Sequence, residues 1–289
     1  MNIRRLIVSL FISVLLVAVA FGGAGEALSR PATGSVGPAP LDLHATSVVV
    51  RTASGGAVSG WLVLGRPRSG AVLLLHGVRS DRRQMVERAR LLSGLGYTAF
   101  LIDLPAHGES TGDRITFGVR EAEGVSAALD YLRNRLPSER IGIVGVSLGA
   151  ASAVLAKAVP SPDAVVLESM FPTIAEAVSD RLVRQLGPAG RYLAPPLLWQ
   201  LPLRLGLHPE QIQPIMDIPS LNAPVLIASG TADEHTTLAE SKRIFEAARE
   251  PKQFWAVEGA AHVDLYRHGP KAYQNTVLPF LEKHLRSGI

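Results

Sequence analysis

A serine stands between two spaced glycines at residues 145–149 (Gly-Val-Ser-Leu-Gly), and this stretch constrains the fold more than any other. An apolar run at residues 141–144 leads into it, and a helix-favouring run at residues 150–156 follows. A serine in this pattern, at a turn from a strand into a helix, is typical of a nucleophile elbow. Such a turn is tight, and glycines relieve the crowding around it. The pattern therefore predicts an α/β chain in which Ser147 projects from the end of a strand.

Strand-like and helix-like runs alternate from about residue 46 onward. Residues 46–52 and 58–64 predict an antiparallel pair, because Gly55 and Gly56 between them favour a turn. The alternation that follows predicts a mostly parallel central sheet with helices on both faces. The predicted strands are residues 71–75, 98–102, 141–146, 164–167, 224–228 and 253–257, and the predicted helices are residues 81–95, 119–132, 238–249 and 273–285.

The segment at about residues 173–221 interrupts this alternation with helical and proline-rich sequence. It predicts a helical cap over the carboxyl ends of the strands, where an open α/β sheet binds its ligand. The apolar run at residues 193–203 suits a pocket for an acyl chain or a face that dips toward lipid. A self-contained packing surface explains the same run equally well.

Composition excludes several classes of function. The 29 basic and 25 acidic residues are dispersed and give a net charge of +4. We see no basic patch with interleaved aromatic residues, so nucleic-acid binding is not expected. The chain contains no cysteine, which rules out disulfides, thiolate metal sites and cysteine nucleophiles. The sequence leaves the oligomeric state open.

The N-terminus predicts export. Arg4 and Arg5 precede an almost uninterrupted apolar run at residues 6–24. A basic segment before an apolar run is the pattern of a signal sequence, and small-residue cleavage sites lie at residues 18–20 and 25–27. At about 1.5 Å per residue the run is also just long enough to cross a bilayer. Either way the rest of the chain is expected outside the cytoplasm, because the arginines stay inside.

These observations divide the chain into three parts. Residues 1–24 are a signal sequence or a transmembrane anchor, which would bind the protein to the membrane only if it stays uncleaved. Residues 25–45 are rich in Gly, Pro, Ala and Ser, a composition that predicts a flexible linker. Residues 46–289 form one catalytic domain that contains the cap.

A serine hydroxyl is a good nucleophile only when a base takes its proton. That base is normally a histidine oriented by a carboxylate, and sites of the strand-turn-helix type have the chain order Ser, acid, His. Asp233 follows the predicted strand at residues 224–228, and His262 follows the last predicted strand in a loop of small residues. We therefore predict Ser147 as nucleophile, Asp233 as orienting acid and His262 as base.

Other residues compete for the roles of acid and base on sequence grounds. The competing acids are Asp217, Glu234 and Asp264, and the competing downstream histidines are His208, His235, His268 and His284. None of these histidines follows a predicted strand as His262 does.

The chemistry also needs two N–H donors aimed at the oxygen of the tetrahedral intermediate. Leu148, the residue after the nucleophile, supplies one. Val78, in the loop after residues 71–75, is predicted to supply the other, and Gly77 beside it lets the backbone approach. We expect a structural role for the side chain of His76.

These motifs together make the chain resemble an α/β-hydrolase-fold serine hydrolase. They are the His76-Gly77 loop, residues 103–110, the elbow, residues 230–233 and residues 259–262. Over residues 46–287 the chain is similar to the bacterial esterases and serine-aminopeptidase-like hydrolases that carry a short helical cap. The resemblance implies hydrolysis of carboxylic or lipid-like esters through an acyl-enzyme, without a metal or an organic cofactor. It also implies that Asp103 and His107 belong to a structural loop.

Two other functions stay open. A peptidase of the aminopeptidase type would use the same three residues and would need an acidic group in the cap, for which Glu176 and Asp180 are candidates. A non-catalytic binding protein would keep the fold without the reaction. Ser147 disfavours epoxide hydrolases, haloalkane dehalogenases and dienelactone hydrolases, which carry Asp or Cys at the elbow.

Overall fold

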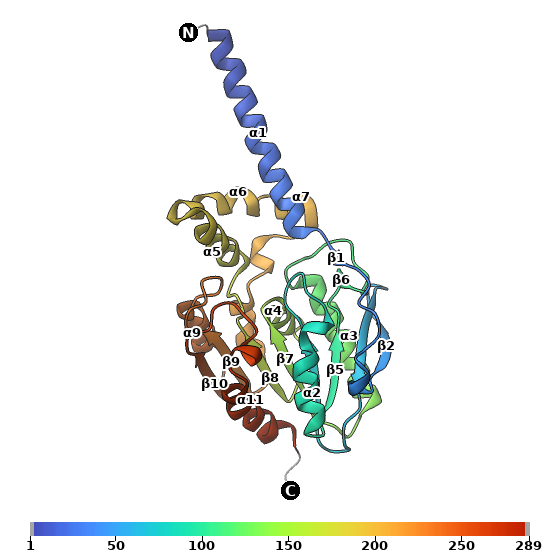
Figure 1. Cartoon of the computed structure of the whole chain (residues 1–289). Helices are drawn as coiled ribbons and strands as arrows, with labels where there is room; N and C mark the ends of the chain where they lie inside the picture. Colours follow the sequence, from blue (N-terminus) through green and yellow to red (C-terminus); the bar gives the residue numbers. More distant parts are fainter. Residues whose placement is uncertain (1–2, 287–289) are drawn as a thin grey trace.

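The computed structural model describes residues 3–286; residues 1–2 and 287–289, at the ends of the predicted N-terminal segment and catalytic domain, lie outside it. Within that range the main sheet has eight strands, in the order β10-β9-β8-β7-β4-β5-β3-β2 (Figure 1). Its strands are β2 (Thr46–Arg51), β3 (Ala57–Val63), β4 (Ala71–Leu75), β5 (Thr98–Ile102), β7 (Ile141–Val146), β8 (Ala164–Glu168), β9 (Val225–Gly230) and β10 (Lys252–Val257). β3 pairs antiparallel with β2 and β5, and all other neighbouring strands of this sheet are parallel. The predicted α/β fold is confirmed.

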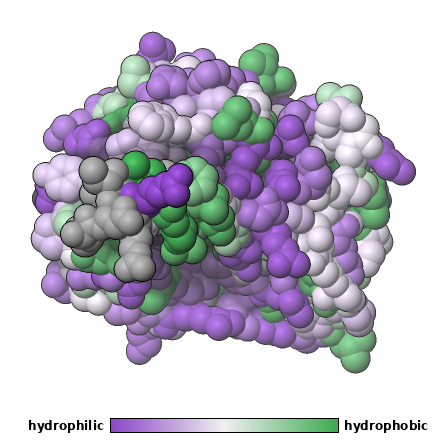
Figure 2. Space-filling view, turned by 90° about the horizontal axis from the view of Figure 1, so that it is seen from above, coloured by the Kyte–Doolittle hydropathy of each residue, from purple (hydrophilic) through white to green (hydrophobic). Residues whose placement is uncertain are grey.

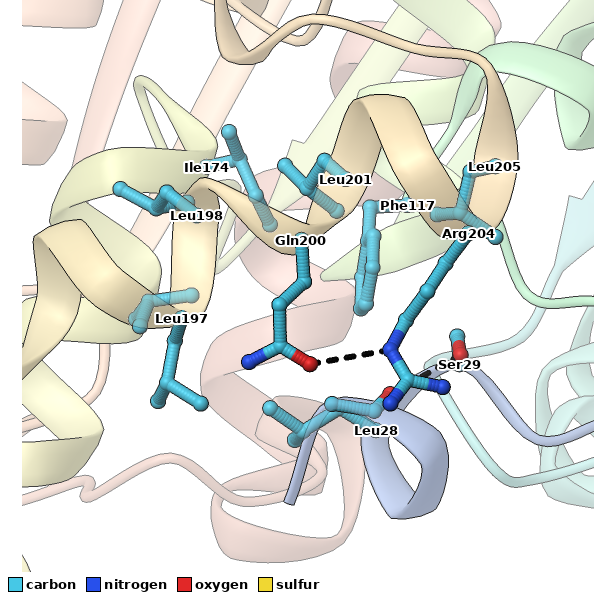
Figure 3. A pocket seen from close by; sticks show the side chains of 12 residues that line it. Leu28, Ser29, Phe117, Ile174, Leu197, Leu198, Gln200, Leu201, Arg204 and Leu205 are labelled. Atoms are coloured by element: carbon cyan, nitrogen blue, oxygen red, sulfur yellow. Dashed lines mark hydrogen bonds between the residues drawn. The ribbon is translucent and has the colours of Figure 1, made fainter. Parts of the chain in front are cut away.

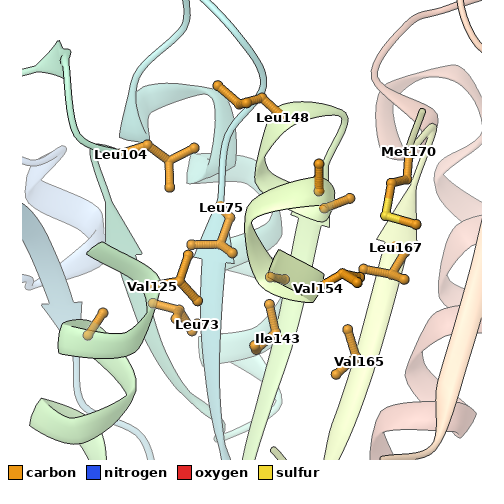
Figure 4. Close-up of a cluster of buried hydrophobic side chains, with 14 of the residues drawn as sticks. Leu73, Leu75, Leu104, Val125, Ile143, Leu148, Val154, Val165, Leu167 and Met170 are labelled. Atoms are coloured by element: carbon orange, nitrogen blue, oxygen red, sulfur yellow. The ribbon is translucent and has the colours of Figure 1, made fainter. Parts of the chain in front are cut away.

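Helices cover both faces of the sheet. Those on one face are α2 (Val86–Gly94) and α11 (Pro270–Leu285), and those on the other are α3 (Val119–Arg135), α4 (Leu148–Leu155) and α9 (Leu238–Ala247). Successive side chains of a strand point to opposite faces. Leu73 and Leu75 of β4 therefore pack toward Val125 of α3 and Val154 of α4 (Figure 4), whereas Leu74 belongs to the other cluster. Because both faces are covered, β4 is buried throughout, which explains its uninterrupted apolar sequence.

Shorter elements complete the fold outside the main sheet. They are β1 (Ala32–Thr33), β6 (His107–Gly108), α10 (Leu265–His268) and the 3-10 helices η1 (Leu41–Leu43) and η2 (Arg82–Met85). The helix predicted at residues 81–95 begins as η2 and continues as α2. Asp81 accepts a hydrogen bond from the Arg83 N–H and so caps this segment.

Between β8 and β9 the chain leaves the sheet and forms a series of short helices. They are α5 (Ile174–Leu186), η3 (Pro188–Leu193), α6 (Ala194–Leu198), α7 (Gln200–Leu205), η4 (Pro209–Gln211), α8 (Pro214–Asp217) and η5 (Ile218–Ser220). α5, α6 and α7 lie beyond one end of the strands (Figure 1). Residues 173–221 are called the cap below.

The N-terminal helix α1 (Ile3–Ser29) projects away from the domain (Figure 1). Seen along its length, apolar side chains line its sides above a largely hydrophilic surface (Figure 2). The helix is long and apolar enough to cross a membrane, a property that signal sequences share. It continues past residue 24, where the predicted N-terminal segment ends.

The segment predicted as a flexible linker differs from that expectation. Its first residues, 25–29, complete α1. Ala32 and Thr33 then pair with β6, and the Glu109 carboxylate accepts hydrogen bonds from the N–H groups of Val36 and Gly37 at 3.0 and 3.1 Å. The composition suggested a tether because it offers few apolar side chains, but backbone groups make most of these contacts.

A buried ionic cluster joins α2, the end of β8 and the C-terminal helices α10 and α11. Arg88 of α2 donates to Glu168 at the end of β8 at 2.6 Å and to Asp264, which caps α10, at 2.9 Å. The Tyr273 hydroxyl of α11 donates to the same Glu168 carboxylate at 2.7 Å. Burial lowers the pKa of Arg88, but the surrounding Glu168, Tyr273 and Asp264 outweigh it and hold that pKa well above its ordinary value. The guanidinium is therefore charged and fully paired.

Replacing Arg88 with Ala is expected to lower the free energy of unfolding by about 3–5 kcal/mol, because Glu168 is left charged and buried without its partner. The matched control is Arg120→Ala, which removes an exposed ion pair with Asp113 and is expected to cost less than about 1 kcal/mol. Denaturant unfolding followed by circular dichroism measures both. Equal losses in the two variants would contradict the structural role of the cluster.

Candidate active site

The chain around Ser147 forms a strained turn between β7 and α4. Ser147 has φ 50° and ψ −107°, a backbone conformation that costs a residue with a side chain about 1–3 kcal/mol. A Cβ at Gly149 would lie 2.6 Å from the Leu75 carbonyl oxygen, and one at Gly145 would lie 2.7 Å from the Ala150 nitrogen. Only glycine fits at these two positions. The Ser147 N–H donates to the Glu168 carbonyl at 2.8 Å, which secures the turn against β8.

The parallel strands bring the predicted acid and base together. Asp233 follows β9 and His262 follows β10, and these strands are direct neighbours. Asp233 Oδ2 lies 2.8 Å from His262 Nδ1, while Oδ1 accepts from the N–H groups of His235 and Thr236 at 2.8 and 2.9 Å. Burial raises the pKa of Asp233, but the hydrogen bond and charge of His262 and the backbone donors outweigh it and hold that pKa below its ordinary value.

The Asp233 contact fixes the protonation pattern of His262. A carboxylate can only accept hydrogen bonds, so Nδ1 carries a proton and Nε2 of the neutral ring keeps its lone pair. Among the residues that the structure describes, no hydrogen bond joins His262 to the Ser147 hydroxyl. Such bonds are often long in an unliganded site and tighten when substrate binds. Both residues follow parallel strands of one sheet, so they lie at the same edge.

Two backbone donors accompany Ser147. Val78 follows β4, and Leu148 is the first residue of α4, so the Leu148 N–H has no acceptor within that helix. In the described part of the chain, the Val78 N–H makes no backbone or side-chain hydrogen bond. Ser147, Val78 and Leu148 line the same cavity. This arrangement suits the stabilisation of an oxyanion beside the serine.

The cavity beside Ser147 is lined mainly by apolar side chains. The apolar residues are Leu28, Val78, Phe117, Leu148, Phe171, Ile174, Ala177 and Val178. Two cations, Arg79 and Arg181, complete the lining. The Arg181 guanidinium donates to the Ala177 carbonyl at 2.9 Å. Burial lowers its pKa, while the charges of Asp180 and Asp233 act in the opposite direction.

Several of these residues escaped prediction. Leu28 lies in α1, Phe117 lies before α3, and Arg181 lies on α5. None belongs to a local motif, and only the tertiary fold brings them to the cavity. The sequence indicated this cavity only through the apolar run of the cap, which suggested a pocket.

His76 has the structural environment that the sequence suggested. Its ring is fully buried, Nδ1 lies 2.7 Å from the Gly77 carbonyl, and Nε2 accepts from the Leu104 N–H at 3.0 Å. Burial, and then the neighbouring His107, lower the pKa of His76 to about 3. The neutral ring thus ties two loops together.

Asp103 has a similar role in the adjoining loop. Its carboxylate accepts hydrogen bonds from the Arg82 side chain and from the Glu109 N–H, the latter at 2.8 Å.

The competing acids have partners elsewhere. Asp264 binds Arg88, Asp217 lies 2.8 Å from Lys157, and Glu234 lies 3.6 Å from Arg184. Within the described residues no group of three or more His, Asp and Glu side chains gathers as metal ligands would.

His235 is the competitor that the structure brings nearest to the predicted base. Its ring centroid lies 5.1 Å from that of His262. Burial, and then His262, lower the pKa of His235. No sequence pattern singled out His235, because it lies in a turn.

The chain is similar to a protein family, to individual proteins and to solved structures. The model of the "Alpha/beta hydrolase family" matches residues 72–273. An uncharacterized protein of Mycobacterium tuberculosis is 34% identical over 81% of this chain and 76% of its own length. Human monoglyceride lipase is 24% identical over 70% of this chain and 78% of its own length. A solved esterase of Pyrococcus furiosus superposes with a TM-score of 0.75 at 23% identity, covering 89% of this chain and 98% of that one.

Replacing Asp233 with Asn is expected to slow the reaction of Ser147 with a fluorophosphonate probe by roughly 10³–10⁴-fold, because the amide no longer fixes the proton on His262 Nδ1. The rate of covalent labelling measures this directly. Asp217→Asn, which alters a cap carboxylate paired with Lys157, is the control and is expected to change the rate less than twofold. Full labelling speed in the Asp233 variant would remove this residue from the site.

Proposed function

Because the chain belongs to the alpha/beta hydrolase family, we propose that it is a serine hydrolase that cleaves carboxylic esters. Ser147 Oγ attacks the ester carbonyl carbon while His262 Nε2 takes the hydroxyl proton. Asp233 stabilises the imidazolium that results, and the N–H groups of Val78 and Leu148 bind the oxyanion. The observation that most supports this proposal is the 2.8 Å contact between Asp233 Oδ2 and His262 Nδ1. It lies at the same edge of the sheet as Ser147, whose backbone is strained.

The reaction then proceeds in two halves. The tetrahedral intermediate collapses, the bond from carbon to the alcohol oxygen breaks, and His262 gives its proton to the departing alcohol. The acyl group is now bonded to Ser147 Oγ. A water molecule gives a proton to His262 as it attacks this acyl-enzyme. When the second intermediate collapses, the carboxylic acid leaves and Ser147 regains its proton.

The cavity favours esters over the substrates of an aminopeptidase. An aminopeptidase would need an acidic group to bind the substrate ammonium, whereas the charged residues that line the cavity are the cations Arg79 and Arg181. Glu176, one acidic candidate, is paired with Arg243. Burial, and then the charge of Glu240, raise the pKa of Asp180 to about 7. The Asp180 carboxyl is therefore partly neutral at pH 7 and a poor partner for an ammonium group.

We extend the proposal to location and domain organisation. α1 exports the protein, either as a retained anchor or as a cleaved signal, and residues 46–289 form the catalytic domain outside the cytoplasm. Residues 173–221 act as its cap. The apolar cavity and the apolar helix together point to acyl substrates of lipid character.

Replacing Ser147 with Ala is expected to abolish fluorophosphonate labelling and to lower kcat for p-nitrophenyl esters by roughly 10⁵-fold or more, because no other group can form the acyl-enzyme. Ser126→Ala, which removes a hydroxyl on α3 that bonds only to the Ala122 carbonyl, is the matched control. Labelling that persists in the Ser147 variant would contradict the proposal. A wild-type protein with neither labelling nor hydrolysis would favour a binding function.

Replacing Asp180 with Asn is expected to stabilise the fold increasingly as pH rises from about 4 to 7. The Asp180 carboxyl stays protonated in the folded protein over this window, whereas it ionises in the unfolded chain, so its contribution to stability is lost as pH rises. The variant escapes this loss, with a gain on the order of 1 kcal/mol at pH 8 after allowance for solvent screening. Urea unfolding at pH 4, 5.5 and 8 measures the trend. Asp113→Asn at an exposed position is the control, and parallel curves for the two variants would contradict the prediction.

A further inference from the structure

The last two turns of α1 are built into the cap. The Gln200 side chain donates to the Phe21 carbonyl at 3.0 Å, and Arg204 forms an ion pair with Glu26 at 2.8 Å. Arg204 also donates to the Gly22 carbonyl. It donates to Gln200 Oε1 as well (Figure 3). Two side chains of α7 thus bind two backbone carbonyls and one carboxylate of α1, all within residues 21–26. The contact is polar and specific rather than a chance approach of two apolar helices.

The body of the domain binds the same end of α1 from another side. Arg114 forms an ion pair with Glu26 at 2.6 Å, so one carboxylate joins arginines from two different segments. Arg79 donates to the carbonyl groups of Ala27 and Leu28. Carbonyls at the C-terminus of a helix lack partners within it and favour a cation. α1 is therefore held at its end by three arginines.

A glycine in α1 permits this close approach. A Cβ at Gly25 would lie 2.4 Å from Gln200 Oε1 and 3.0 Å from Arg204 Nε. Any larger residue would push α1 away from α7 or displace the polar side chains between them.

The cavity beside Ser147 continues to this end of α1. A second cavity lies between α1, α5, α6 and α7, and Leu28, Phe117, Ile174 and Val178 line both cavities. Figure 3 shows Leu28 of α1 opposite Leu197 and Leu198 of α6, with Phe117 beside Arg204. An acyl chain bonded to Ser147 would therefore run beneath the cap toward α1, and Leu28 would lie along its path.

The length of the apolar run of α1 before its first cap contact sets where the cavity lies relative to a bilayer. Residues 6–20 lie between the two arginines and the first cap contact, at Phe21, and span about 23 Å, most of the ~30 Å hydrocarbon thickness of a membrane. The domain thus follows the apolar span with no spacer. On the cap, Tyr192, Trp199 and Leu203 are 75%, 76% and 89% exposed. Exposed Tyr and Trp side chains next to a membrane span are favoured in the headgroup layer.

We propose that residues 22–29 of α1 form one wall of the acyl-binding pocket, which accepts the long acyl chains of esters held in the membrane. This proposal rests on the proposed ester hydrolysis at Ser147. Leu28 is its specificity-determining residue, and Glu26 is a positioning residue that keeps Leu28 in place through Arg114 and Arg204. Cleavage after Ala27 would separate Glu26 from the domain. The proposal therefore requires that the active enzyme retains residues 22–29.

The first test compares two tryptophan substitutions in the full-length protein in detergent. Leu28→Trp is expected to lower the ratio of kcat/KM for p-nitrophenyl dodecanoate to that for p-nitrophenyl acetate at least tenfold, because the indole obstructs the path of the long chain. Leu16→Trp, on the exposed part of the same helix, is expected to change this ratio less than twofold. An unchanged ratio in the Leu28 variant overturns the proposal.

The second test measures the docking of α1 without using activity. The natural chain contains no cysteine, so a Gly25→Cys and Gln200→Cys double variant carries the only thiols. The Gln200 change removes the amide that a Cβ at residue 25 would meet, so the two helices can still approach. Mild oxidation of membranes that contain the full chain is expected to cross-link this pair, whereas Leu16→Cys with Gln200→Cys is expected to stay uncross-linked. Equal cross-linking of the two pairs, or none in the first, overturns the proposal. An N-terminus after Ala27, found by intact mass measurement of the active protein, does the same.

Loss of the proposed ester hydrolysis and loss of the proposed pocket wall give different results. A wild-type protein that neither hydrolyses an ester nor reacts with a fluorophosphonate removes the proposed function. An active wild-type protein whose chain-length preference ignores Leu28→Trp removes only the pocket wall.

Discussion

The guanidinium of Arg88 lies where the elbow, the loop of the proposed base and two helices meet. Its partner Glu168 accepts the Ser147 N–H through its backbone carbonyl and binds Arg88 through its carboxylate. Arg88 also binds Asp264, two residues after His262. One buried cation therefore links the strand beside the nucleophile to the loop that carries the base. A well-packed apolar replacement can match such an ion pair in stability, but it would not fix these two segments with the same directionality.

Local sequence patterns predicted the sheet well because each strand carries its own signal. The bounds of β4, β5 and β7 agree with the predicted ranges, since an apolar run buried on both faces begins and ends sharply. The elbow was equally recognisable, because steric crowding leaves only glycine at residues 145 and 149. Chain order and position after a strand singled out Asp233 and His262, and the structure brings these two side chains into contact.

What the sequence did not show depends on contacts between distant segments. Leu28 and Arg181 reach the cavity through packing of α1 and α5, and neither stands in a pattern that distinguishes it from a surface residue. Arg88 is one of several arginines in the predicted helix at residues 81–95, yet its side chain is 1% exposed. The stretch at residues 25–45 resembled a tether by composition, but β1 pairs with β6 through backbone groups that composition does not report.

A rigid junction between α1 and the cap has a mechanical consequence that a flexible linker would not have. A tether lets a domain tumble, so the mouth of its pocket faces the membrane only part of the time. Here Arg79, Arg114 and Arg204 bind the last turns of α1, so in the proposed membrane-held enzyme the helix would fix both the height and the tilt of the cap. Two of these arginines also border cavities: Arg79 lines the cavity beside Ser147, and Arg204 lines the one next to it. In the proposed membrane-held enzyme, one group of contacts would therefore set both the orientation at the membrane and the shape of the acyl path, and a change that loosens α1 would alter both together.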